Sequence, residues 1–194
     1  MNYLGHMYLS GKDAELMLGN FIADAVKGNQ IDSFPDPVKR GILLHRKIDA
    51  FTDHHSSSRA LNRLLNPHFR KYSGVVVDMY YDHFLARNWT TFSSEDLKSF
   101  TEANYRILQR HFLQLPARSR RILPFMMKDN WLMAYASFAG LDQAFRGIAR
   151  RTPFYSGMEK GVAVLRDHYA ECRACFECFM PDVTAFVAEE KERM

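Results

Sequence analysis

The stretch FPDPVKRGILLHRKIDAFTDHH at residues 34–55 decides the fold. Its apolar residues recur at the spacing of an amphipathic helix. Asp36 is suited to cap that helix and Pro37 to stand first in it, where a missing N–H costs nothing. His45 and Asp49 lie one turn apart within the apolar run, and Asp53 follows one turn later on the same stripe. The stretch therefore predicts a helix with polar groups turned toward the protein interior.

The remainder of the chain also reads as helices separated by short turn signals, with no internal repeat and no alternating strand pattern. Asp13 is expected to cap a helix that stops at Gly28, and Trp131 is expected in the core. We predict an all-α, single-domain bundle of seven or eight helices over residues 1–194. The other helices are expected at 60–65, 69–89, 97–113, 117–140 (divided or kinked at Pro124) and 155–191 (broken or bent at Pro181).

Composition limits the function classes. The length of 194 residues suits one domain. A composition of 47% hydrophobic and 25% charged residues excludes a disordered or fibrous chain. A net charge of +4 is a mild surplus, so we expect no nucleic-acid partner, and an acidic macromolecule fits better than a duplex. Neither a membrane span nor a secretory signal is visible, which predicts a cytoplasmic protein.

The three cysteines lie close together, at Cys172, Cys175 and Cys178. An odd number of cysteines argues against a disulfide framework. The spacing resembles an iron–sulfur motif, but a fourth thiolate is missing, and three small apolar residues on one helix face explain it better.

Polar side chains embedded in apolar runs are the informative ones, because a buried carboxylate needs a cation, a partner or a metal. Three predicted helices each carry such residues four positions apart on one face. Nitrogen and oxygen donors that project from neighbouring helices into a bundle suit Mn²⁺ or Mg²⁺. The three pairs are Asn20 with Asp24, His45 with Asp49, and Asp78 with Asp82.

Two further histidines could join this site, His6 and His83. His6 lies in the apolar segment NYLGHMYL, where a lone histidine is more often a core residue than a ligand, and His83 points about 100° away from its neighbour Asp82. The chain has no G-x-S-x-G elbow, no phosphate-binding glycine loop and no G-x-G-x-x-G motif, so acyl-enzyme, nucleotide-driven and dinucleotide chemistry lack their usual parts.

Four segments in order, MNYLGH (1–6), GNFIADAVKG (19–28), GILLHRKIDAFTDHH (41–55) and DMYYDHFLARNW (78–89), resemble the acyl-carrier-protein phosphodiesterase family. These bacterial hydrolases resemble distant HD-type metal-dependent phosphohydrolases. The resemblance implies an all-helical, Mn²⁺-favouring enzyme that cleaves the phosphodiester between 4′-phosphopantetheine and a serine of acyl carrier protein. The adjacent His-Asp doublet that names the HD superfamily is absent from the chain.

The resemblance also implies the site residues. We expect Asp24, His45, Asp49 and Asp78 to hold Mn²⁺ or Mg²⁺, with a water activated by the ion attacking phosphorus. The same metal set includes His6 and Asn20. The expected catalytic residues are Arg46 as a phosphate clamp, Asp82 or His83 as the group that passes a proton to the leaving serine, and Asp53.

Because the carrier protein is acidic, we expect a rim of basic residues beside the metal site that attracts it. Two sets of cations are candidates, one flanking the motif helices and one further along the chain. They are Lys27, Lys39, Arg40, Arg46 and Lys47 in the first set, and Arg118, Arg120 and Arg121 in the second.

Three alternatives remain open. The same metal site suits an HD-type hydrolase of a nucleotide or another small phosphoester. An oxygen-activating dinuclear protein is less suited, because such proteins use Glu-x-x-His pairs and this chain has none. A non-catalytic helical binding module would use the polar pairs as ordinary interhelical hydrogen bonds.

Overall fold

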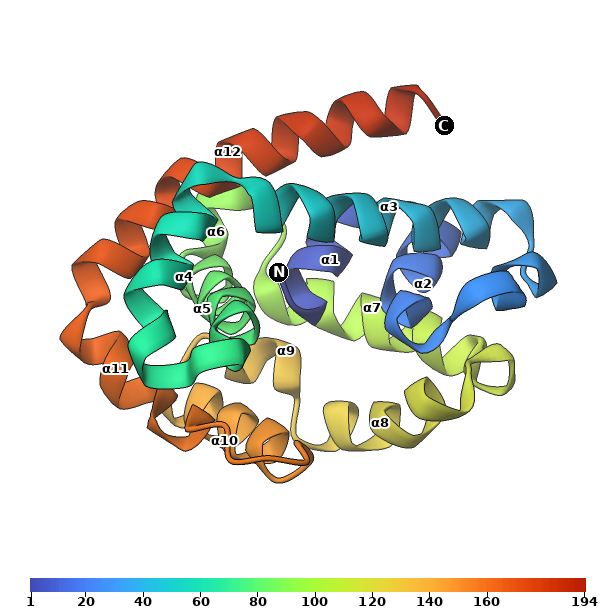
Figure 1. Ribbon diagram of the computed structural model, residues 1–194. Coiled ribbons are helices and arrows are strands. Elements are labelled where there is room, and N and C mark those ends of the chain that lie inside the picture. Colours follow the sequence, from blue (N-terminus) through green and yellow to red (C-terminus); the bar gives the residue numbers. More distant parts are fainter.

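The computed structural model describes all 194 residues, and helices make up the entire regular structure, as predicted. Twelve α-helices follow one another, joined by short loops and five 3₁₀ turns (Figure 1). They are α1 (Tyr3–Ser10), α2 (Ala14–Ile22), α3 (Asp36–His54), α4 (Ser56–Phe69), α5 (Ser73–Arg87), α6 (Trp89–Phe92), α7 (Leu97–Arg110), α8 (Ala117–Lys128), α9 (Trp131–Ala134), α10 (Phe138–Ala149), α11 (Gly161–Asp167) and α12 (Tyr169–Glu192).

The helix count exceeds the predicted seven or eight, because α1, most of α6 and most of α10 lie outside the predicted ranges and two predicted ranges are divided. The segment 117–140 contains α8, α9 and the start of α10, while α12 follows α11 after His168. Prolines are not the points of division: Pro124 lies inside α8, and Pro181 lies inside α12. Apolar periodicity does not reveal breaks at ordinary residues, so sequence reading merged neighbouring short helices.

The predicted caps are confirmed only in part, since Asp36 does not cap α3: the helix begins at Asp36, after Pro35, with no side-chain cap. Asp13 accepts hydrogen bonds from the backbone N–H groups of Glu15 and Leu16, as an N-cap residue should. Asp96 caps α7 by accepting a hydrogen bond from the backbone N–H of Ser99. The expected helix before Gly28 ends sooner than predicted, at Ile22, and a 3₁₀ turn follows.

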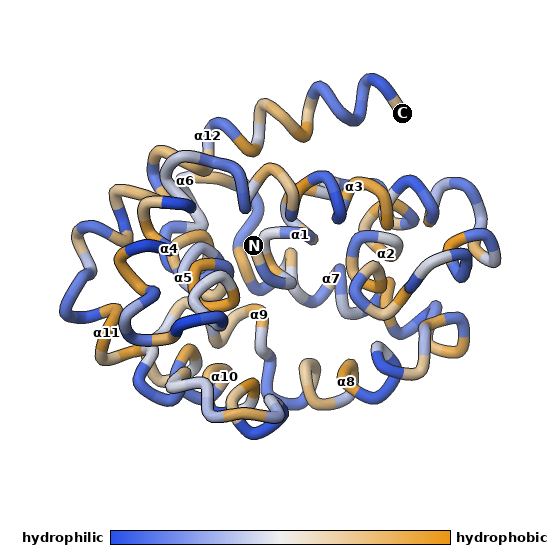
Figure 2. The backbone as a smooth tube through the Cα atoms, viewed as in Figure 1, coloured by the Kyte–Doolittle hydropathy of each residue, from blue (hydrophilic) through white to orange (hydrophobic).

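One hydrophobic core unites 45 buried residues contributed by every part of the chain. Hydropathy alternates along α3 and α12, as it does in helices with one buried face (Figure 2). The helices surround the N-terminal helix α1, which lies at the centre of the molecule in Figure 1. No helix is long and apolar enough to cross a membrane.

The closest helix pair is α2 with α3, and two glycines make that closeness possible. A Cβ on Gly41 would overlap the carbonyl oxygen of Leu16 and lie 2.8 Å from the Cα of Gly19. A Cβ on Gly19 would overlap the carbonyl oxygen of Val38. Because the obstacles are backbone atoms, they cannot give way as a side chain would. The two helices therefore cross with their backbones in contact.

We predict that Gly41→Ala lowers the free energy of unfolding by about 1–3 kcal/mol, because the added methyl forces α2 and α3 apart. Gly147→Ala is the matched control, since Gly147 also lies in a helix but a Cβ there meets nothing within 4 Å. The free energy of unfolding of the control should exceed that of the parent by up to about 1 kcal/mol, because alanine is the better helix former. Urea unfolding measures both. Equal stability of the two variants would contradict the close crossing.

Candidate functional site

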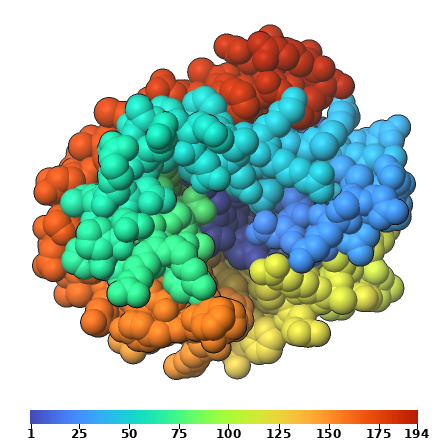
Figure 3. All heavy atoms as spheres, viewed as in Figure 1, coloured from blue at the N-terminus to red at the C-terminus, as the bar shows by residue number.

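A cavity of about 1140 Å³ opens at the centre of the ring of helices. Figure 3 shows it as a hollow with N-terminal residues at its base, surrounded by the surfaces of other segments. Its lining divides into two parts. Residues of α1, α3, α5 and the 3₁₀ turn after α2 bring histidine and carboxylate side chains, whereas α8, α10 and the segment after α10 bring arginines.

His45 on α3 is the central group of the acidic side, and Asn20 on α2 sets its orientation. Asn20 Nδ2 donates to the carbonyl oxygen of His6 and to Ser10 Oγ, so Asn20 Oδ1 faces His45 Nδ1 at 3.0 Å as an acceptor. The proton of neutral His45 is therefore on Nδ1. Nε2 keeps its lone pair and faces the cavity, which is the arrangement of a histidine ligand held by a supporting residue.

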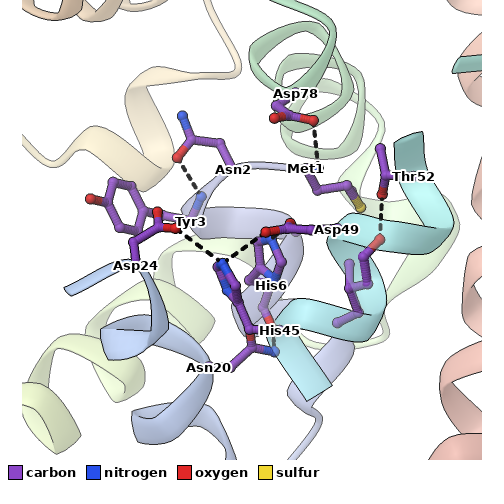
Figure 4. Close-up of polar contacts among 12 residues, drawn as sticks. Met1, Asn2, Tyr3, His6, Asn20, Asp24, His45, Asp49, Thr52 and Asp78 are labelled. Atoms are coloured by element: carbon purple, nitrogen blue, oxygen red, sulfur yellow. Dashed lines mark hydrogen bonds and ion pairs between the residues drawn. The ribbon is translucent and has the colours of Figure 1, made fainter. Parts of the chain in front are cut away.

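Two carboxylates face that nitrogen (Figure 4). Asp24 Oδ1 lies 3.4 Å and Asp49 Oδ2 lies 3.1 Å from His45 Nε2. Burial opposes a charge on the ring, but the hydrogen bonds and charges of Asp24 and Asp49 prevail and raise the pKa of His45 to about 9. Without another cation, the site holds its own proton between two carboxylates.

His6 on α1 completes the cluster. Its ring stacks on that of His45, with centroids 4.0 Å apart, and its Nε2 lies 3.2 Å from Asp49 Oδ1. This contact with Asp49 is not aligned as a hydrogen bond, and His6 Nδ1 has no partner either, although the side chain is buried. Burial, followed by the nearby charge of His45, lowers the pKa of His6, so the ring is held neutral with a free lone pair.

The donor atoms of His6, His45 and Asp49 all lie within 4.8 Å of one another, which makes this group a possible metal site. Two imidazoles and a carboxylate suit a borderline or hard divalent ion. The unpartnered buried nitrogens of His6 are the sign that the residues fit such an ion, because a buried polar atom otherwise goes without compensation. Asp24 is the nearest further carboxylate to His45.

Asn20 and Asp78, both expected as ligands, have other partners. Asn20 lies behind His45 and contacts its far nitrogen. Asp78 lines the cavity, but its Oδ1 accepts a hydrogen bond of 2.7 Å from the N-terminal ammonium of Met1. Burial raises the pKa of Asp78 despite the lowering effect of that ammonium.

Asp82 and His83 on α5 lie outside the cavity lining. Asp82 is fully buried and accepts hydrogen bonds from the backbone N–H groups of Asn2, Leu4 and Gly5 at 2.8–3.1 Å. It thereby caps the first turn of α1, and burial raises its pKa to about 7 against these bonds. His83 Nδ1 contacts the carbonyl oxygen of Tyr135 at 2.7 Å. Asp82 thus anchors the start of α1, and His83 is part of the protein interior.

Of the two remaining predicted residues, one lines the cavity and one does not. Asp53 lines the cavity and makes no hydrogen bond or ion pair with another side chain. Arg46 does not line it, and its Nη2 donates instead to the carbonyl oxygen of Val26 at 3.3 Å.

The arginine side of the cavity was largely missed by sequence reading. Of the candidate cations, only Arg118 and Arg121 line the cavity, and they are joined there by three arginines near or after the end of α10. Trp131 was expected in the core; it packs against the hydrophobic core and also lines the cavity. The second half of the chain has no motif to mark these residues, so only their position in space reveals them. The additional three are Arg146, Arg150 and Arg151.

These features define a class: an all-helical enzyme in which histidine and carboxylate side chains meet at the base of a deep, partly basic cavity. A family model described as acyl carrier protein phosphodiesterase matches residues 1–183. The chain belongs to the acyl carrier protein phosphodiesterase family.

Curated relatives match over most of their length. A protein of Photorhabdus laumondii named acyl carrier protein phosphodiesterase is 30% identical over 93% of this chain and 92% of the relative. Proteins with the same name from Serratia proteamaculans and Escherichia coli O157:H7 are 29% and 28% identical, over 94% and 95% of this chain and 95% and 96% of their own lengths. No solved structure matches the chain, so the HD-like topology stays a prediction.

We predict that Mn²⁺ binds and that its affinity falls steeply with acid, because His45 must lose a proton to bind the ion. A His45 pKa near 9 means that the metal-free site is protonated throughout the neutral range. Lowering the pH from about 8.5 to about 6.5 should weaken binding by about 50- to 100-fold, against about twofold for an ordinary histidine.

Thermal-shift titrations with Mn²⁺ across this pH range measure the effect, since a ligand present at a hundredfold excess over its Kd adds about 2.7 kcal/mol of stability. His111→Ala is the control, because His111 lies far from the cluster in sequence and contacts Gln114. A flat affinity over this range, or no shift with Mn²⁺ or Mg²⁺, would contradict the assignment.

Proposed function

We propose that this protein is a divalent-metal-dependent phosphodiesterase that releases 4′-phosphopantetheine from holo acyl carrier protein. The observation that carries the proposal is the cluster of His6, His45 and Asp49 at the base of the cavity. The names of the family and of its relatives support the choice of carrier protein as substrate.

Within this proposal, His45, Asp49 and His6 hold the ion, and Asp24 is the fourth candidate ligand. An ion bound there would polarise a phosphoryl oxygen and acidify a water. Asn20 fixes His45 in the tautomer that leaves Nε2 free. Asp53 is the carboxyl we assign to proton transfer in place of Asp82 and His83, because it lines the cavity without a partner of its own.

The dimensions of the cavity also favour a long substrate arm. Its volume of about 1140 Å³ lies at or above the upper end of small-molecule sites, about 300–1,000 Å³. Exposed Phe125 lines it next to polar groups, and Tyr3, Phe21 and Trp131 add apolar surface. An extended pantetheine chain, which combines amides and an apolar end, suits such a lining.

The direct test is incubation of the purified protein with holo acyl carrier protein and Mn²⁺, read by mass. Loss of the phosphopantetheine mass from the carrier, with appearance of the free phosphopantetheine, would establish the reaction. Hydrolysis of a nucleotide or another small phosphoester with no effect on the carrier would favour the HD-type alternative. An intact carrier, no small-molecule turnover and no metal-dependent stability would favour a binding module.

We predict that His45→Ala and Asp49→Ala each reduce turnover by more than about hundredfold, because each removes a donor from the cluster. His111→Ala and Cys175→Ala should keep turnover close to the parent, since neither residue lines the cavity. Circular dichroism and melting must accompany each rate, because a variant that fails to fold also loses activity. A folded His45→Ala protein with parental turnover would remove His45 from the site.

The carrier is proposed to dock over the arginine side of the cavity. Exposed Arg121 and Phe125 lie one turn apart on α8 and both line the cavity, so a basic and an apolar contact are offered together. Lys39, from the set that flanks the motif helices, lies outside the lining and pairs with Asp36. An acidic protein surface would meet α8 first.

We therefore predict that salt raises KM for the carrier and leaves kcat nearly unchanged, because exposed charges act over only about 10 Å at 0.1 M salt. Arg121→Glu should raise KM at low salt and flatten the salt dependence, whereas Lys39→Glu, the matched control, should do neither. A small phosphodiester without the carrier should be hydrolysed at a rate that salt barely affects. Equal salt sensitivity for both substrates would place recognition outside the arginine rim.

A further inference from the structure

Most of the arginines that line the cavity form no ion pair within the protein. Of these five arginines, Arg146 forms an ion pair with Asp142, its Nε 2.6 Å from Asp142 Oδ2. The other four pair with no carboxylate of the chain. A metal cluster draws a phosphate toward one side of the cavity, so cations on the other side are placed for the oxygens of the same anion.

Arg151 is the arginine among these four that a cavity-lining aromatic residue orients. Its guanidinium lies over the ring of Trp131, 5.5 Å from the centroid, and both residues line the cavity. Its backbone N–H donates to the carbonyl oxygen of Ile148, which ties it to the end of α10. A planar guanidinium stacked on an indole keeps its edge donors free for an oxyanion.

Tyr3 lines the same cavity, beside the acidic residues of the metal cluster. Figure 4 shows its ring beside Asp24 on the acidic side of the cavity. Burial raises the pKa of the Tyr3 hydroxyl, the charge of Asp24 raises it further, and Arg118 and Arg151 both act to lower it. Tyr3 lines the same cavity as Arg118 and Arg151, and its hydroxyl makes no hydrogen bond within the protein.

We propose that Arg151, seated on Trp131, forms with Arg118 and the Tyr3 hydroxyl an anion subsite that binds the phosphate oxygens turned away from the metal cluster. This inference rests on the proposed function and specifies how its substrate is held. The inference assigns the phosphate contact to these residues instead of Arg46, which donates to Val26 outside the cavity. The ligand class is a phosphate group on a pantetheine arm, either free or attached to the carrier.

Two cations on one side and a divalent ion on the other leave a phosphodiester in contact with positive charge on both faces. A guanidinium can donate two parallel hydrogen bonds to such a group, which a lysine cannot do. Arg118 and Arg151 come from separate elements, α8 and the segment after α10, so only the folded chain brings both into one cavity.

The test measures binding, independently of turnover. Titration calorimetry with 4′-phosphopantetheine and with pantetheine, each in excess Mn²⁺, isolates the contribution of the phosphate. Arg151→Met should weaken phosphopantetheine binding by about tenfold or more and leave pantetheine binding unchanged, because it removes charge-assisted hydrogen bonds to phosphate alone. Arg151→Lys should recover part of the loss, and Tyr3→Phe should weaken phosphopantetheine binding by a smaller factor.

Arg120→Met is the matched control, since Arg120 lies beside Arg121 on α8 but outside the cavity, and its affinity should equal that of the parent. Melting curves with Mn²⁺ show whether each variant folds and retains its metal. Parental phosphopantetheine affinity in Arg151→Met, an equal loss in Arg120→Met, or a parent that binds pantetheine as tightly as phosphopantetheine would each overturn the subsite.

These results separate the subsite from the proposed reaction. If the parent leaves holo acyl carrier protein intact but binds phosphopantetheine in an Arg151-dependent manner, the reaction fails and the subsite stands. If the parent releases phosphopantetheine from the carrier while Arg151→Met binds and turns over as the parent does, the reaction stands and the subsite fails.

Discussion

The backbone contact between Gly19 and Gly41 is the constraint on which the site depends. Because neither residue has a side chain, α2 and α3 approach until Gly19 Cα faces Gly41 Cα. Asn20 follows Gly19 directly, and His45 lies one turn beyond Gly41, so the crossing brings the amide within 3.0 Å of the imidazole. A larger residue at the crossing would separate the helices and leave His45 without the partner that sets its tautomer.

A second constraint joins α1 to α5. Asp82 takes three backbone N–H groups at the start of α1, which satisfies donors that no residue within the helix can reach. A fully buried carboxylate is costly, and these bonds together with the helix N-terminus compensate for it. The anchored helix then presents His6 to His45. A carboxylate that resembles a catalytic group in sequence thus contributes to the site by holding a ligand helix in place.

The chemistry of the cavity is divided between the two halves of the chain. Helices α1 and α3 and the 3₁₀ turn after α2 place carboxylates and imidazoles so close together that a cation is required among them, either the proton on His45 or a divalent ion. The second half supplies arginines that the protein leaves mostly unpaired. Such a separation of charge lets one anion contact both sides, which neither half alone provides.

The sequence by itself determined the all-α class, the helix that carries His45 and Asp49, and the polar residues embedded in apolar runs, because periodicity and spacing are local properties of the chain. The tertiary structure alone decided what each polar residue meets. It placed Asn20 behind His45, Asp82 at the first turn of α1, Arg46 outside the cavity, and Arg151 in the cavity lining beside Trp131. Periodicity states which face of a helix turns inward, but the partner across the interface comes from another helix, distant in sequence, and only packing brings the two together.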